Sequence, residues 1–174
     1  MSDEELMAGV QEGRFEHLDL LVERYQRPLF GYSVRVLHQS HAAEDAVQEV
    51  FLRVFRCRAQ YRRGAPFKAW VYQICLNVCR DALRRSKRRP ADPLDDLPLA
   101  DPAPGPEQQT VLAHRIQTAI ARLPDKLREV FMLVHYQGLL YQEVAQVLGI
   151  PMGTVKSRMF HATSKLAEDL KDLR

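Results

Sequence analysis

Apolar residues recur along this chain with the spacing of helices. Phe15, Leu18, Val22 and Tyr25 fall on one helical face, and similar three- and four-residue spacing recurs in the segments that follow. No segment keeps the alternation of apolar and polar residues that marks a half-buried strand. The sequence therefore predicts an all-α protein, with about four helices on each side of a central proline-rich segment.

The first half of the chain carries several helix start and stop signals. Ser2 and Glu5 have the spacing of a capping box, and Gly13 is expected to end the first helix. Pro28 is expected to bend or interrupt the second helix before the run from Leu29 to Leu37. A third helix is predicted over residues 42–58, with a core side of Ala46, Val47, Val50, Phe51, Val54 and Phe55.

Residues 141–166 predict a helix-turn-helix. Gly149 suits the left-handed turn between two short amphipathic helices, and Pro151 suits the first turn of the second helix. The second helix has a buried stripe of Val155, Met159, Ala162 and Leu166. Its outward face carries basic side chains, hydroxyl groups, His161 and the bulky Phe160, and these groups can contact DNA. The alternative is a helical hairpin with a solvated basic face, but an apolar ring on that face argues for a partner.

The central segment, residues 90–106, predicts a linker between two domains. Its six prolines exclude a helix and favour an extended spacer. It carries four aspartates and no basic residue, whereas the net charge is +5 over residues 1–90 and +2 over residues 107–174. An acidic linker of this kind is either a soluble tether or a mimic of a nucleic-acid strand in a partner's groove.

Composition narrows the class of protein. No apolar run is long enough to span a bilayer, and the first ten residues carry acids where a signal peptide carries bases, so we expect a soluble cytoplasmic protein without membrane insertion. Cys57, Cys75 and Cys79 are interpreted as small buried hydrophobes. Cys75 and Cys79 lie one turn apart, but nothing completes a zinc-like set, so we expect no metal or cofactor. His38 and His41 are expected in a solvated turn.

Residues 60–89 mix aromatic side chains with many bases, as single-stranded nucleic-acid sites do. A helix starting near Phe67 has apolar faces and, between them, a polar stripe of Gln73, Asn77, Arg80 and Arg84. Trp70 falls on the main apolar face, which favours a core role over a base-stacking wedge. The loop from Tyr61 to Pro66 could form a pocket for an extruded base, with Asn77 supplying hydrogen bonds. The basic end of this helix is alternatively a solvated terminus.

Three segments, taken in order, resemble the extracytoplasmic-function (ECF) sigma factors of bacteria. They are AAEDAVQEVFLRVFR, FKAWVYQICLNVCRDALRR and LPDKLREVFMLVHYQGLLYQEVAQVLGIPMGTVKSR. The resemblance extends from about Phe15 to Leu166, and the joint occurrence of these segments with a proline-rich linker is specific, whereas the helix-turn-helix alone is not. It implies a sigma region 2 domain at residues 1–89, a flexible linker at 90–106 and a sigma region 4 domain at 107–174.

The resemblance also implies roles for particular residues. Core RNA polymerase would be bound by Glu44, Asp45, Gln48, Glu49 and Phe51. The minus-ten promoter element would be recognised and melted by Tyr61, Arg62, Arg63, Lys68, Asn77, Arg80, Arg84 and Arg85, with Asn77 at the position that reads a flipped non-template base. The minus-thirty-five element would be read by Thr154, Lys156, Ser157, Arg158, Phe160, His161 and Lys165.

The chain departs from the family pattern in two places. Leu140 stands where the family usually has a serine, so the expected N-cap of the next helix is missing, at a cost of about 1 kcal/mol. His161 and Thr163 stand where family members often carry arginine. The promoter sequence therefore stays open.

Together these features predict a transcription initiation factor without catalytic residues. It would bind core RNA polymerase and promoter DNA, and the resemblance implies control by an anti-sigma factor, often membrane-anchored. The main alternative is a stand-alone repressor or activator, which explains the helix-turn-helix but not residues 61–89. An enzyme acting on nucleic acid is disfavoured, since no phosphate-binding Gly-rich loop and no nucleophile or paired-carboxylate arrangement is present.

Overall fold

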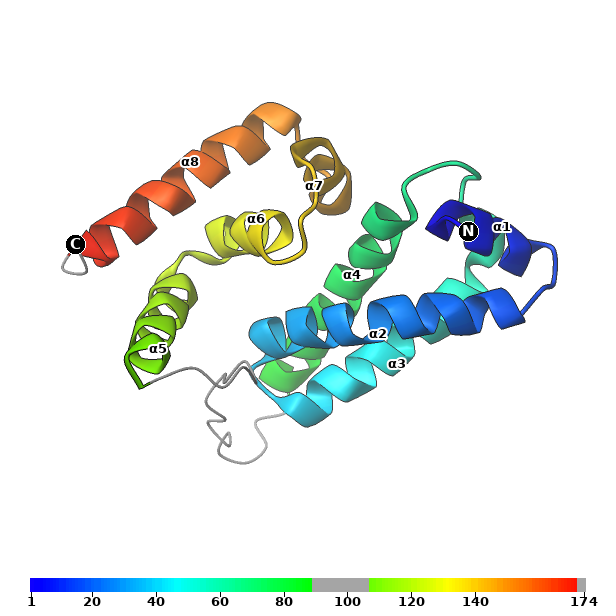
Figure 1. Ribbon diagram of the computed structural model, residues 1–174, viewed down its shortest axis with the longest axis horizontal. Helices are drawn as coiled ribbons and strands as arrows, with labels where there is room; N and C mark the ends of the chain where they lie inside the picture. Colours follow the sequence, from blue (N-terminus) through cyan, green and yellow to red (C-terminus); the bar gives the residue numbers. More distant parts are fainter. Residues whose placement is uncertain (89–106, 172–174) are drawn as a thin grey trace. The chain divides into compact units, whose positions relative to one another are not determined.

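The structure is a computed structural model that describes residues 1–88 and 107–171 of the 174-residue chain. Within these ranges every regular element is a helix, which confirms the all-α class (Figure 1). The helices form two units: the first contains α1 to α4, and the second contains α5, α6, α8 and most of α7. The predicted linker, residues 90–106, lies outside the described residues.

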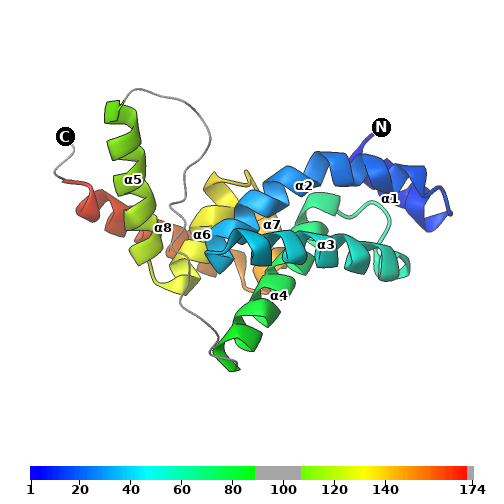
Figure 2. The same cartoon turned by 90° about the horizontal axis from the view of Figure 1, so that it is seen from below.

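The first unit is built on α2, α3 and α4, which pack against one another, with α1 packed on α2 (Figures 1 and 2). Its elements are α1 (Asp3–Gln11), α2 (Glu16–Leu37), α3 (Ser40–Arg56), the short 3-10 helix η1 (Arg58–Gln60) and α4 (Phe67–Arg88). The apolar side chains buried among them include Leu6, Leu21, Leu29, Val50, Val71 and Leu76. Burial of these groups is the main stabilising contribution to the unit.

The helix ends of the first unit follow the sequence signals, with one exception. The Ser2 hydroxyl accepts from the Glu5 amide at 3.2 Å and the Glu5 carboxylate accepts from the Ser2 amide at 2.7 Å, which confirms the capping box. Gly13 follows α1 at a φ of 89°. Pro28 was expected to bend or interrupt α2, and the interruption is wrong, because α2 continues through it. Pro28 is exposed, so water can reach the backbone carbonyl of Arg24, which lacks its helical donor.

The three cysteines differ in how deeply they are buried. Cys75 and Cys79 are fully buried on α4, as expected of small core residues, whereas Cys57 is only half-buried. The Ser33 hydroxyl of α2 lies 3.5 Å from the Cys75 sulfur and 3.6 Å from the Cys79 sulfur. These thiols therefore belong to the α2–α4 interface.

The second unit packs α5 and α6 against α8. Its elements are α5 (Glu107–Arg122), α6 (Asp125–His135), α7 (Tyr141–Leu148) and α8 (Met152–Asp169). The buried cluster between α5 and α8 consists of Ala119, Ile120, Leu123, Ala162 and Leu166. Val155, Met159, Ala162 and Leu166 are all buried, which confirms the predicted stripe on α8.

The turn between α7 and α8 has the predicted conformation. Gly149 has a φ of 64°, which L-residues with a side chain rarely adopt. The missing serine at Leu140 is partly offset, because the Glu143 carboxylate accepts from the Leu140 amide at 2.7 Å. That contact is the second half of a capping box. Across the described ranges, no helix is both long and apolar enough to cross a membrane.

Substitutions at two leucines of α2 test the packing of the first unit. Leu29 is fully buried and Leu20 is 38% exposed. We expect Leu29→Ala to lower the free energy of unfolding by about 2–5 kcal/mol and Leu20→Ala by less than about 1 kcal/mol. Trp70, the single tryptophan, lies in this unit, so its fluorescence during urea unfolding reports the change. Equal losses in the two variants would contradict this packing.

Candidate functional site

The loop between η1 and α4 is held in place by a side chain of α1. The Gln11 amide group donates to the backbone carbonyls of Arg58 at 2.7 Å and Tyr61 at 2.8 Å. Tyr61 begins the loop that the sequence assigns to nucleic-acid binding, and Arg58 lies just before it. Gln11 therefore fixes the path of the backbone into that segment.

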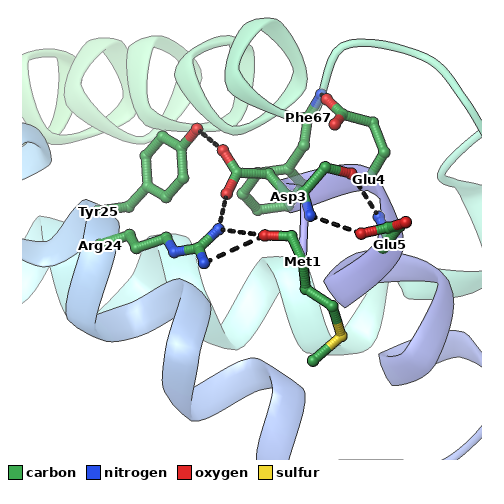
Figure 3. Close-up of polar contacts among 8 residues, drawn as sticks. Met1, Asp3, Glu4, Glu5, Arg24, Tyr25 and Phe67 are labelled. Atoms are coloured by element: carbon green, nitrogen blue, oxygen red, sulfur yellow. Dashed lines mark hydrogen bonds and ion pairs between the residues drawn. The ribbon is translucent and has the colours of Figure 1, made fainter.

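The start of α4 is fixed by the same N-terminal helix. The Glu4 carboxylate accepts from the Phe67 backbone amide at 3.1 Å, and a negative charge is favourable at a helix N-terminus (Figure 3). The neighbouring Asp3 carboxylate accepts from the Tyr25 hydroxyl and from the Arg24 guanidinium, the latter at 2.6 Å. These contacts fasten α1 to α2 and α4 together.

An aromatic cluster fills the space beneath the loop. The Phe67 ring lies 5.3 Å from the Tyr25 ring, 6.1 Å from the Tyr61 ring and 6.0 Å from the Trp70 ring, measured between centroids. All three pairs are inclined, as the electrostatics of aromatic rings favour. Phe67 is fully buried and Trp70 is half-buried. Trp70 therefore contacts this cluster, but it is not among the buried core residues that its place on the apolar face predicted.

Tyr61 differs from its sequence interpretation. Its side chain is only 3% exposed, and its hydroxyl donates to the Ala65 carbonyl across the loop. Burial, with the charges of Glu4 and Asp3 nearby, raises the pKa of Tyr61 to about 12, so the hydroxyl stays a donor. Its ring packs against Phe67 and Trp70, with centroids 6.1 and 5.1 Å away, and so presents little surface to a base. We therefore assign Tyr61 to the support of the loop.

The basic side chains of the loop lie on its outer side. Arg62 and Arg63 are exposed, and Lys68 in the first turn of α4 is half-buried. Arg63 is partly tied down, since its guanidinium is 3.0 Å from the Glu12 carboxylate and 3.2 Å from the Gln11 side-chain oxygen. These side chains present positive charge next to the cluster around Phe67.

The polar stripe predicted on α4 is accessible to a partner. Gln73, Asn77 and Arg84 are exposed and Arg80 is half-buried, and Arg85 is exposed beside the stripe. The remaining faces of the helix supply Val71, Tyr72, Cys75, Leu76, Val78 and Cys79 to the core. Side-chain amides and guanidinium groups thus follow one line along a helix that the core holds rigid.

The predicted polymerase-binding residues share the solvent side of α3. Glu44, Asp45 and Gln48 are exposed, and Glu49 and Phe51 are half-buried. The sequence interpretation missed Leu52, which is 49% exposed among these residues. The available signal is its helical position, because the period of 3.6 residues places it on the polar face.

The outward face of α8 is as predicted. Lys156, Ser157, Phe160, His161 and Lys165 are exposed, and Thr154 and Arg158 are half-buried. Phe160 is 68% exposed, and its ring centroid lies 5.7 Å from that of His161. The Thr163 hydroxyl instead donates to the backbone carbonyls of Met159 and Phe160 at 3.0 and 2.9 Å. Thr163 is thereby turned back onto its own helix.

Two family models match the chain, one on each unit. Residues 21–89 match sigma-70 region 2, and residues 113–166 match sigma-70 region 4. One relative, the ECF RNA polymerase sigma factor SigM of Mycobacterium tuberculosis, is 35% identical over 95% of this chain and 83% of its own length. The chain is an ECF sigma factor.

Other comparisons agree with this family. The RNA polymerase sigma-H factor of Pseudomonas aeruginosa is 31% identical, with 98% of this sigma factor and 95% of the relative covered. The structure of CnrH in complex with the cytosolic domain of CnrY matches at a TM-score of 0.76 and 24% identity over 98% of this chain and 97% of that one. RpoE of Bartonella quintana, crystallised with the anti-sigma factor NepR, matches at 0.73 and 24% identity, over 90% and 98%. At this identity the structures support the fold.

Helix α1 lies outside the region 2 match of this sigma factor. Its contacts to the loop and to α4 were therefore not among the residues that the resemblance supplied. The sequence carried no local signal for them, because Gln11 and Tyr61 are 50 residues apart and Glu4 and Phe67 are 63 apart. Gln11 and Glu4 join the candidate site as positioning residues.

Loss of the Gln11 contacts should loosen the loop of this sigma factor. We expect Gln11→Ala to speed amide hydrogen exchange in the segment from Arg58 to Phe67, with little change in α3. Hydrogen exchange followed by mass spectrometry measures this. Gln26→Ala, at an exposed position of α2, is the control and should leave the segment unchanged. Unchanged exchange in Gln11→Ala would show that α1 does not hold the loop.

Proposed function

We propose that this sigma factor binds core RNA polymerase and directs promoter-specific initiation through two separate DNA-binding faces. The observation that carries the proposal is the polar and basic stripe of α4, exposed on a helix whose other sides are buried. A second such face lies on α8, in the other unit. A repressor or activator needs only the second face, so the stripe on α4 favours the sigma function.

The polymerase-binding surface would lie on α3. Glu44, Asp45, Gln48 and Glu49 provide acidic and polar groups, while Phe51 and Leu52 provide apolar area. An apolar centre with a charged rim is the usual composition of a specific protein interface. Core RNA polymerase would supply the complementary basic and apolar groups.

The minus-ten element would be recognised along α4 and the adjoining loop. Asn77 would read a flipped non-template base, since a side-chain amide can both donate and accept on a base edge. Arg62, Arg63 and Lys68 would contact phosphates near the loop, and Arg80, Arg84 and Arg85 would do so further along the helix. Tyr61 would support this surface from below without touching DNA. Binding energy, without chemistry by this chain, would drive opening.

The minus-thirty-five element would be read by α8 as the recognition helix of a helix-turn-helix in the major groove. Lys156, Arg158 and Lys165 would position the helix on phosphates, with Thr154 and Ser157 as further hydrogen-bonding groups. Phe160 and His161 would reach base edges, where an apolar ring can contact a thymine methyl group. They are the positions at which this member would read its own promoter.

An anti-sigma factor is the second partner we propose. CnrH and RpoE, which share this fold, are seen in complex with CnrY and the anti-sigma factor NepR. A protein of this kind, soluble or membrane-anchored, would cover the polymerase-binding surface until a signal releases it. The sigma factor would then act in the cytoplasm, where RNA polymerase works, with residues 90–106 as the tether between its domains.

Run-off transcription tests the proposed function. Promoter fragments would come from sequencing transcripts after overexpression, which identifies both elements at once. We expect the sigma factor to associate with core RNA polymerase in a pull-down and to start transcription at these promoters. Tight binding of the free protein to duplex operator DNA, with no association with the polymerase, would contradict the proposal and favour a stand-alone repressor or activator.

Variants of the two faces should separate promoter opening from promoter binding. We expect Asn77→Ala to reduce opening about ten-fold or more while duplex binding changes little, because the flipped base forms only on melting. Phe160→Ala should instead weaken duplex binding about ten-fold. Permanganate reactivity of melted thymines and filter binding of the closed complex measure the two steps. Equal loss of both steps in Asn77→Ala would contradict its role.

A further inference from the structure

A chain of ionic contacts joins α3 to the end of α4. The Glu49 carboxylate lies 2.7 Å from the Arg53 guanidinium, and Arg53 lies 3.5 Å from one oxygen of the Asp81 carboxylate. The other Asp81 oxygen lies 2.5 Å from the Arg84 guanidinium. Arg53, Asp81, Arg84 and Arg85 line one recess on this surface.

The two ends of this chain belong to different binding surfaces. Glu49 is part of the proposed polymerase surface, and Arg84 is part of the proposed surface for the minus-ten element. Between them, Arg53 and Asp81 have no assigned role. Both are about one-third exposed, at 32% and 36% of the side chain, so water only partly screens their interactions.

Asp81 occupies a position that a nucleic-acid phosphate could take on Arg84. A carboxylate and a phosphate both accept charge-assisted hydrogen bonds from a guanidinium group, so they compete for it. The hydrogen bond from Arg84 is the main reason that the pKa of Asp81 is lowered, so the carboxylate stays ionised. Arg84 is 69% exposed, so a phosphate in solution can reach it.

Arg53 contacts two acidic side chains at unequal distances. It is 2.7 Å from Glu49 but 3.5 Å from Asp81, so Glu49 holds it more closely. A polymerase cation that bound Glu49 would free Arg53 to move onto Asp81. Asp81 would then hold Arg84 less tightly, because its charge would be shared with a closer partner.

We propose that Asp81 is a positioning residue that couples polymerase binding to DNA binding, by holding Arg84 in the free protein and releasing it to a DNA phosphate when Arg53 leaves Glu49. The proposal rests on the proposed function of the two surfaces. Because coupling between two sites is reciprocal, DNA bound at Arg84 would also tighten the polymerase at Glu49.

The coupling is measured as the ratio of two DNA affinities, that of the complex with core RNA polymerase over that of the free protein. This ratio is the gain that polymerase provides. A fluorescent single-stranded DNA of mixed sequence is bound once by the free full-length protein and once by its complex with core RNA polymerase. Asp81→Asn should raise the affinity of the free protein about two- to five-fold, the size expected for one exposed ion pair, and should lower the gain that polymerase provides. Asp19→Asn removes the same charge at an exposed site of α2 and should change neither quantity.

A second variant is expected to change only one of the two quantities. Arg53→Met leaves Asp81 to Arg84 alone, so the free protein should not bind DNA more tightly and the gain from polymerase should fall. Circular dichroism melting of each variant checks that it is folded, and Asp81→Glu, which keeps the charge, should restore the wild-type gain at least in part. If Arg53→Met keeps the full gain, the coupling proposal is wrong.

The outcomes separate this inference from the function on which it rests. If Arg84→Ala leaves the DNA affinity of the polymerase complex unchanged, the assignment of Arg84 to DNA fails. If Arg84→Ala weakens binding but Asp81→Asn behaves as Asp19→Asn does, the DNA surface stands and the coupling is overturned. An equal rise in affinity in both aspartate variants would assign the effect to net charge and would also overturn it.

Discussion

The packing of Phe67 is the constraint on which the proposed minus-ten surface depends. Its ring lies against Tyr25 of α2, Tyr61 of the loop and Trp70 of α4, and its backbone amide is bonded to Glu4 of α1. One residue thus sets where α4 starts, how the loop folds back and where α1 is fastened. Truncation of such a ring in a well-packed core costs about 3–5 kcal/mol, so the geometry of the loop and of the start of α4 depends on it.

With α4 fixed, its polar face is held ready for the role we propose. A helix buried on its other sides presents Asn77 in one place, which a flexible segment cannot do, and preorganisation reduces the entropy lost on binding. The same unit carries the acidic and apolar face of α3, and the ionic contacts from Glu49 through Arg53 and Asp81 to Arg84 cross between them. The surfaces that we propose for polymerase and for melted DNA thus share one helical unit.

Short-range features could be predicted from the sequence, and long-range contacts could not. The stripe from Val155 to Leu166, the turn at Gly149 and the Ser2–Glu5 capping box all follow from local spacing. Pro28 does not interrupt α2, because an exposed proline can be accommodated within a helix that tertiary packing holds. The burial of Tyr61 was not predicted, because spacing in a loop does not show which way a ring points. Glu4 and Gln11 contact partners on other elements, and Asp81 contacts Arg53 of α3, which no periodicity reveals.

Site-specific photocross-linking tests the central claim, that α4 and α8 are separate DNA-binding faces, most directly. A photoreactive phenylalanine analogue would replace Gln73, which is exposed one turn before Asn77 on α4, or Phe160 in the holoenzyme on its promoter. We expect position 73 to cross-link to the non-template strand of the minus-ten element in the open complex, and position 160 to duplex DNA at the minus-thirty-five element. Cross-links from both positions to the same element, or none from position 73 to melted DNA, would contradict two separate DNA-binding faces.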